Sequence, residues 1–192
     1  MPTLKDKNAP YYEARRLIDE GRNDEAFELY VQLASDGDPN CQVFVGWMLV
    51  EGIGVTSNPP EGFEWFKRAA NMGSARGAYA CANYLLVQKR DAEAIPYLRR
   101  AANAAFGPAT LWLGICHFTG RGVAKNSQKG ISLMEEAAQQ GNWIAKRKLA
   151  TLKIRGHYGW PGIIAGVVVL PILIISALFT LMVDGYSENF MG

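Results

Sequence analysis

The first 156 residues contain an internal repeat, and this repeat restricts the fold more than any other feature of the sequence. The segment VGWMLVEGIGV at 45–55 is similar to LGICHFTGRGV at 113–123, and the offset of 68 residues pairs Gly46 with Gly114. Because 68 is twice 34, the offset predicts a further unit between the two copies. Repeats of this length are typical of arrays in which stacked units share one continuous core.

A small residue marks the same position in every unit. These residues are Ala14, Gly46, Ala82, Gly114 and Ala150, at spacings of 32, 36, 32 and 36 residues. Small side chains at such positions allow neighbouring helices to approach closely. The unit of Ala82 is four residues shorter than its neighbours between the small residue and the Ala-Ala pair that follows, which predicts a shorter turn there.

Each unit is predicted to contain two helices. Apolar residues recur at helical spacing, as Phe63, Phe66 and Ala70 do, and Gly73 lies where a helix is expected to end. The pattern predicts helices at 9–20, 24–36, 40–50, 60–72, 75–88, 91–105, 108–118, 127–140 and 143–155. We therefore expect an all-α chain, with an N-terminal tail at 1–8 and a repeat domain of about four and a half repeats at 9–156.

The C-terminal region contains a long apolar segment. The 22 residues of 162–183 carry no charge, and as a helix they would extend about 33 Å, close to the thickness of bilayer hydrocarbon. The sequence therefore predicts a transmembrane helix at 161–183, with a linker at 157–160 and a short tail at 184–192. Gly162 and Gly166 have the G-x-x-x-G spacing that allows two membrane helices to pack closely, so a homo-oligomer is one expectation.

The charges on either side of this segment predict its orientation. Five cations precede it and none follows it; they are Lys146, Arg147, Lys148, Lys153 and Arg155. Cytoplasmic flanks carry the excess of Lys and Arg, so we expect a tail-anchored protein with a cytoplasmic N-terminal domain. No apolar signal-peptide core is found near the N-terminus. The same cations are also suited to attract anionic lipid.

Two features of the sequence raise the question of catalysis or metal binding. Cys116 and His117 are adjacent, as in a nucleophile or metal site. However, the repeat places Leu49 at the position of His117, so we expect His117 to be a packing residue. The three cysteines, Cys41, Cys81 and Cys116, cannot all pair in disulfides, and we expect them to be small buried residues. The sequence thus predicts no catalytic residue, metal or cofactor.

Exposed aromatic side chains are candidates for binding a protein partner, because aromatic residues dominate interaction hot spots. By the repeat pattern, Trp47, Tyr84 and Trp112 lie on the first helices of three consecutive units, and we expect them to form one strip on the surface. The alternative is that they pack in the core. Nucleic acid is not an expected partner, because 20 Lys+Arg against 18 Asp+Glu give a net charge of only +2.

The pattern L-G-x-x-x-x-x-G-x-G-V, followed by an Ala-Ala pair and a glycine, resembles the Sel1-like repeat family, which is related to the tetratricopeptide repeat. Residues 40–73 and 108–141 are good copies, 9–37 and 75–106 are degenerate, and 143–156 is half a copy. The resemblance implies a right-handed α-solenoid that binds other proteins along a concave face and has no enzymatic activity.

These observations together predict a non-enzymatic, membrane-anchored scaffold or adaptor for protein partners. The family resemblance favours an accessory subunit of a bacterial inner-membrane assembly for envelope polysaccharide biogenesis or secretion. The alternative is a regulatory or quality-control adaptor that is tail-anchored in a eukaryotic organelle membrane.

Overall fold

The computed structural model describes residues 4–154 of the chain. The expected linker at 157–160, membrane helix at 161–183 with Gly162 and Gly166, and tail at 184–192 lie outside the described residues. In the part that is described, none of the helices has both the length and the apolar character of a membrane span.

The described residues form nine α-helices and no strand. The helices are α1 (Leu4–Asp19), α2 (Asn23–Ser35), α3 (Pro39–Glu51), α4 (Pro59–Asn71), α5 (Ala75–Val87), α6 (Asp91–Asn103), α7 (Gly107–Thr119), α8 (Ser127–Gln139) and α9 (Trp143–Ile154). The all-α prediction is confirmed, and apart from the start of α1 every predicted boundary lies within two residues of the observed one. Helix α1 begins at Leu4, ahead of the predicted start at residue 9, and it continues through Pro10.

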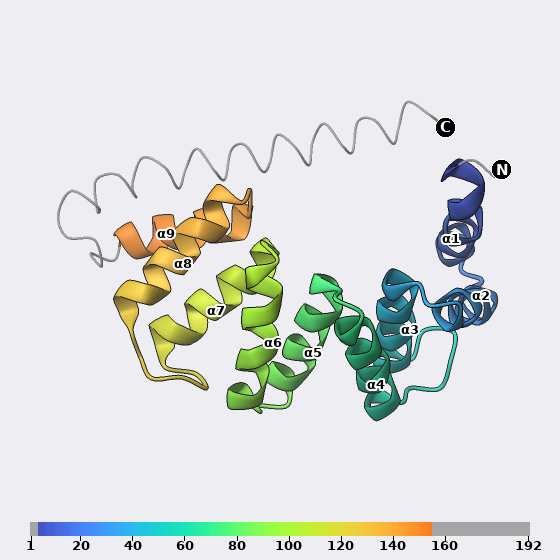
Figure 1. The fold of residues 1–192 in the computed structure, drawn as a ribbon, viewed down its shortest axis with the longest axis horizontal. Helices are drawn as coiled ribbons and strands as arrows, with labels where there is room; N and C mark the ends of the chain where they lie inside the picture. The colour runs from blue at the N-terminus through green and yellow to red at the C-terminus, as the bar shows by residue number, and fades with distance from the viewer. Residues whose placement is uncertain (1–3, 155–192) are drawn as a thin grey trace.

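The helices follow one another along an arc that runs from α1 to α9 (Figure 1). Each helix packs against the next one in the chain, and α3 also contacts α5 in the following unit. This arrangement is an α-solenoid, in which every unit buries its apolar surface against its neighbours. The buried residues form three clusters along the arc, one among α1–α3, one among α4–α7 and one among α7–α9.

The small residues of the repeat lie where the two helices of a unit cross. A Cβ atom built on Gly46 of α3 would lie 2.5 Å from the ring of Phe66 and 2.8 Å from the backbone oxygen of Gly62, both in α4. No real Cβ atom fits at such distances, so only glycine allows this approach. The expectation that the small residue serves helix packing is confirmed at Gly46.

The units alternate between two kinds of connection. Loops of seven residues, 52–58 and 120–126, follow α3 and α7, whereas turns of three residues follow α1 and α5. Each long loop packs on the start of a second helix in the preceding unit: a Cβ atom on Gly122 would lie 2.5 Å from the backbone of Asp91 in α6. The same loop is tied to α6 by Arg121, whose Nη2 donates to Asp91 Oδ1 at 2.6 Å.

Candidate functional site

The three aromatic residues predicted to bind a partner lie in different environments. Trp47 on α3 is 41% exposed and belongs to none of the three buried clusters. Tyr84 on α5 is half-buried, and its ring stacks on Phe63 of α4 with centroids 4.8 Å apart. Trp112 on α7 is also half-buried and packs against the central cluster. Tyr84 and Trp112 therefore contribute to packing between units, and Trp47 alone of the three is largely free at the surface.

Trp112 also lines a groove between α7 and α9, the first helices of the last two units. The groove has a volume of about 480 Å³ and is lined by Leu111, Trp112, Ile115, Ile144, Arg147, Lys148, Thr151 and Leu152. Three of these residues come from α7 and five from α9. We call this feature the α7–α9 groove. Its volume lies within the range of about 300–1,000 Å³ that is usual for ligand sites.

The lining of the α7–α9 groove is apolar and positively charged. It contains two cations, Arg147 and Lys148, and no carboxylate. The guanidinium of Arg147 lies over the ring of Trp143, 5.1 Å from its centroid, which restrains the side chain. Among the described residues, neither Arg147 nor Lys148 forms an ion pair. The groove therefore offers two positive charges beside the half-buried side chains of Trp112 and Ile115 and the exposed Ile144.

The start of α9 adds exposed apolar surface at the rim of the groove. Trp143 is 57% exposed and Ile144 is 43% exposed. Asn142 caps the helix, because its side-chain oxygen accepts from the backbone N–H of Ala145 at 3.0 Å, and this N-cap fixes the position of Trp143 and Ile144. Large apolar side chains that stay exposed on an ordered helix are typical of a contact surface.

The adjacent Cys116 and His117 lie in the interior and do not face the groove lining. Cys116 is fully buried, and His117 is only 6% exposed. Burial lowers the pKa of His117, and the nearby charges of Lys129 and Arg99 lower it further. The imidazole is thus kept neutral, as suits a packing residue, and the expectation from the repeat pattern is confirmed.

The cysteines are buried as expected and are free thiols. Burial raises the pKa of Cys41 and of Cys81 to about 12, and it also raises the pKa of Cys116. A thiol is a nucleophile or metal ligand only as the thiolate, so these residues are poorly suited to either role at neutral pH. Within residues 4–154, no three His, Cys, Asp or Glu side chains are grouped closely enough to hold a metal ion.

Sequence reasoning did not identify the residues that α9 contributes to the groove. In the sequence alone, Arg147 and Lys148 indicate only membrane topology or attraction to lipid, and nothing marks Ile144 as a site residue. One signal for the site is present in the sequence: residues 143–153 contain four cations and no carboxylate, in half a repeat whose first helix packs beside α7. What the arrangement offers chemically is a surface for binding.

The sequence profile of the Sel1 repeat matches residues 39–74 and 107–142, which contain α3–α4 and α7–α8. These are the two segments described above as good copies, and the resemblance to this family is confirmed. No curated protein matches the sequence.

Several solved structures share the fold. A Sel1 repeat protein from Oxalobacter formigenes is 25% identical, with a TM-score of 0.69 over 80% of this chain and 67% of that protein. The immunity protein Pa5087 from Pseudomonas aeruginosa is 20% identical, with a TM-score of 0.62 over 86% of this chain and 66% of that protein. MamA from Desulfovibrio magneticus RS-1 is 17% identical, with a TM-score of 0.56 over 87% of this chain and 92% of that protein.

Proposed function

Because the chain belongs to the Sel1-like repeat family, whose members are protein–protein interaction scaffolds, we propose that it is a non-enzymatic scaffold that holds protein partners at a membrane. The observation that carries the proposal is the α7–α9 groove, in which Trp112, Ile115 and Ile144 lie beside two cations that form no ion pair among the described residues. Apolar surface of this kind in an ordered array is suited to a binding partner.

The proposed membrane anchor is the apolar segment at 161–183. Its uncharged stretch is long enough to cross bilayer hydrocarbon as a helix, and the cations of α9 precede it closely. By the positive-inside rule, the repeat domain would lie in the cytoplasm and residues 184–192 on the far side. The spacing of Gly162 and Gly166 supports contact between two such membrane helices as a route to a homo-oligomer.

The cellular context that we propose is the bacterial inner membrane, where the chain would be an accessory subunit of an assembly for envelope polysaccharide biogenesis or secretion. The similar structure from Oxalobacter formigenes is bacterial and supports this context. The alternative remains an adaptor in a eukaryotic organelle membrane, for which the same domain order and the same orientation would serve.

The anchor and its orientation are tested together. A reporter that is active only outside the cytoplasm is fused after Gly192, and the same reporter is fused before Met1 as the control. We expect activity from the C-terminal fusion alone, and the full chain should stay with the membrane after alkaline extraction. Activity of the N-terminal fusion alone, or release of the chain by alkali, would contradict the proposed anchor and orientation.

The scaffold function is tested by recovering partners from native membranes. The full chain, tagged at its N-terminus, is cross-linked in cells, extracted in mild detergent and compared with a tagged single-pass protein of unrelated fold. We expect a defined set of proteins that is enriched only with the repeat protein. If the two baits recover the same proteins, or if the purified chain turns over substrate in hydrolase screens, a different function must be sought.

A further inference from the structure

We infer that the α7–α9 groove binds an extended segment of a partner protein in which large apolar side chains alternate with carboxylates. This inference rests on the proposed scaffold function and names the chemistry of the partner. It follows from the apolar walls of the groove, from its two cations, and from its size.

The walls of the groove select for apolar side chains. Leu111 of α7 and Leu152 of α9 are buried in the lining, whereas Ile115 of α7 is half-buried and Ile144 of α9 is exposed, so these last two are open to a partner. Trp112 adds the indole to the same wall. A partner that covered this surface with large apolar side chains would remove it from water, which is the main source of affinity in protein association.

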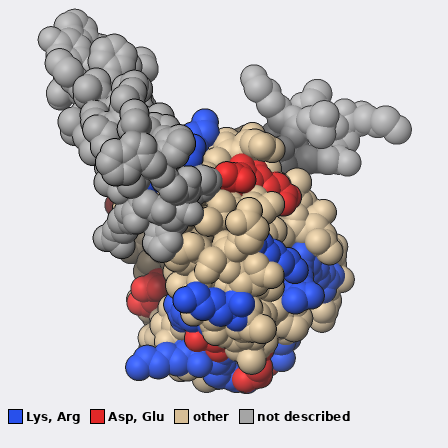
Figure 2. Space-filling model, turned by 90° about the vertical axis from the view of Figure 1, so that its left-hand side faces the viewer, with Lys and Arg blue, Asp and Glu red and all other residues tan. Residues whose placement is uncertain are grey.

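The charge of the groove selects for carboxylates. Arg147 and Lys148 are adjacent in the sequence, both side chains line the groove, and no Asp or Glu lines it. The end of the molecule that contains α8 and α9 shows patches of Lys and Arg, together with smaller patches of Asp and Glu, on a largely uncharged surface (Figure 2). An Arg held over an aromatic ring, as Arg147 is over Trp143, keeps its N–H groups available for a carboxylate. Cations without an internal partner are complementary to an acidic ligand.

The size and shape of the groove favour a segment of chain over other occupants. A volume of about 480 Å³ accommodates a few side chains and not a folded domain. A flat bilayer surface does not enter a groove between two helices, and a nucleic acid would bring a row of phosphates to a lining that is mostly apolar. An extended peptide places its side chains alternately on two sides, so apolar and acidic residues in alternation meet the wall and the cations together.

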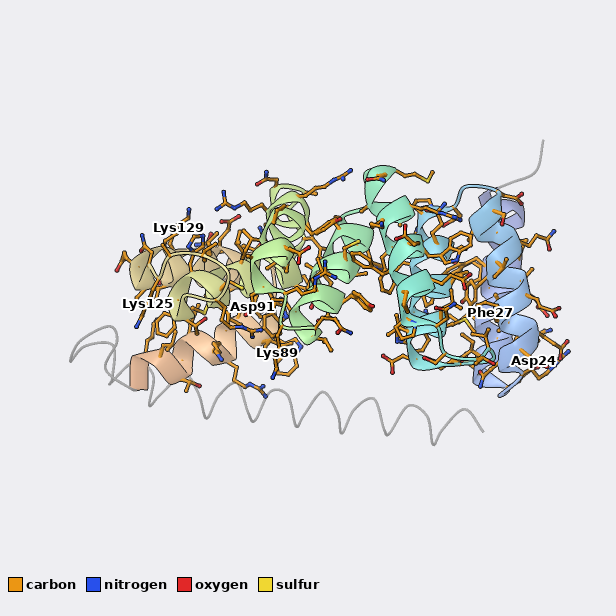
Figure 3. The ribbon with its side chains drawn as sticks, turned by 90° about the horizontal axis from the view of Figure 1, so that it is seen from below. Asp24, Phe27, Lys89, Asp91, Lys125 and Lys129 are labelled. Atoms are coloured by element: carbon orange, nitrogen blue, oxygen red, sulfur yellow. The ribbon has the colours of Figure 1, made fainter. Side chains whose placement is uncertain are left out.

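A second group of cations lies at the edge of the molecule near the α7–α8 loop. Lys89, Lys125 and Lys129 lie along the same side of the molecule as Asp91 (Figure 3), and Asp91 is already paired with Arg121. Charge alone therefore does not distinguish the α7–α9 groove from this edge. The groove differs from this edge because it combines cations with an apolar wall. The experiment below separates the contribution of the charge from that of the apolar wall.

The test measures binding of short fluorescent peptides to the purified full chain in mild detergent, with detergent alone as the blank. The probes are a peptide of alternating Glu and Leu, its charge reversal with Lys in place of Glu, and an apolar control with Ser in place of Leu. We expect only the Glu-Leu peptide to bind well. Equal binding of the Lys-Leu peptide would overturn the role of the cations, and equal binding of the Glu-Ser peptide would overturn the role of the apolar wall.

Matched variants locate the binding site. In the double variant Arg147→Gln/Lys148→Gln, affinity for the Glu-Leu peptide should fall about tenfold, because two ion pairs are lost. Lys146→Gln removes an exposed cation of the same helix that does not line the groove, and it should leave affinity unchanged. Ile144→Ser removes apolar surface at the rim and should also weaken binding. An equal loss in Lys146→Gln, or no loss in the double variant, would overturn the inference.

A failure of this inference can be distinguished from a failure of the proposed scaffold function. The double variant is also used as bait in the cross-linking experiment on native membranes. If it recovers all the partners of the parent chain, the scaffold function stands and the groove is not its binding site. If the parent chain recovers no specific partner, the scaffold function itself fails. Anionic vesicles that displace the Glu-Leu peptide from the parent, and that bind the parent but not the double variant, would assign Arg147 and Lys148 to lipid and overturn the inference.

Discussion

Gly114 of α7 and Gly130 of α8 face each other so closely that neither position has room for a side chain. A Cβ atom on Gly114 would lie 2.9 Å from the backbone oxygen of Gly130, and one on Gly130 would lie 2.7 Å from that of Gly114. The relationship repeats that of Gly46 and Gly62 in the earlier unit. In both units the two helices approach until their backbones are in contact.

This contact between the backbones of α7 and α8 predicts that even one added methyl group lowers the stability of the chain. Gly114→Ala should lower the free energy of unfolding by about 1–3 kcal/mol, and Gly114→Leu by more, because the helices must separate to admit the side chain. Gly107→Ala is the control, since a Cβ atom there would meet its nearest neighbour at 3.5 Å, an ordinary contact. Urea unfolding of the three variants measures these changes in the free energy of unfolding. Equal stability of Gly114→Ala and Gly107→Ala would show that α7 and α8 are not packed as described.

A second prediction concerns the turn after α6. Ala105 has a positive φ of 55°, whereas the equivalent positions after α4 and α8 are Gly73 and Gly141, with φ of 90° and 86°. A left-handed conformation costs a non-glycine residue about 1 kcal/mol or more. Ala105→Gly should therefore stabilise the chain by about 0.5–1 kcal/mol. Ala104→Gly, at a φ of −87°, is the control and should be neutral or destabilising. A loss of stability in Ala105→Gly would contradict the assigned turn.

The buried imidazole predicts sensitivity to acid. Because the pKa of His117 is lowered from its ordinary value of 6.5, the unfolded chain binds a proton below about pH 6.5 that the folded chain does not. The stability supplied by the neutral imidazole is complete above pH 6.5 and is lost as the pH falls from there towards the lowered pKa, by up to about 1.4 kcal/mol per pH unit. His117→Leu, which copies Leu49 of the earlier repeat, should reduce this dependence. Identical pH profiles for the parent and this variant would exclude His117 as the cause.

The thiols predict a pattern of chemical reactivity. With the pKa of Cys41 and Cys81 raised to about 12 and that of Cys116 also raised, very little thiolate is present at pH 7 in the folded chain. Alkylation by iodoacetamide, followed by mass spectrometry, should be slow in buffer and fast in urea at all three positions. Fast alkylation of Cys116 in the folded chain would instead restore the nucleophile hypothesis for the Cys116–His117 pair.

The repeat pattern predicted the fold well because it reports local packing. The position of Gly46 and the 68-residue offset to Gly114 follow from the need for two helices to cross closely, so the sequence alone indicated both. The bidentate ion pair of Arg22 with Glu25, and its copy between Arg90 and Glu93, lie at the same offset but were missed. They depend on turn geometry that a periodic pattern of apolar residues does not describe.

The candidate site was harder to predict because it depends on the distance between helices that are far apart in the sequence. Trp112 and Arg147 line one groove, but nothing in the pattern of either helix states how far α7 lies from α9. The expected strip of Trp47, Tyr84 and Trp112 assumed that residues on equivalent helices share a face. Tyr84 lies one position further along its helix from the small residue than Trp47 does, and its ring stacks on Phe63 instead.

Seven-residue loops and three-residue turns alternate along the chain, and this alternation restricts how the array can be lengthened or shortened. Each seven-residue loop packs on the start of the second helix of the preceding unit, next to the three-residue turn of that unit, as the 120–126 loop does at Asp91. Duplicating or deleting one helix pair would bring two long loops to the same place. Adding or removing 68 residues keeps every long loop beside a short turn. A designed extension of the chain should therefore be made in steps of the double repeat.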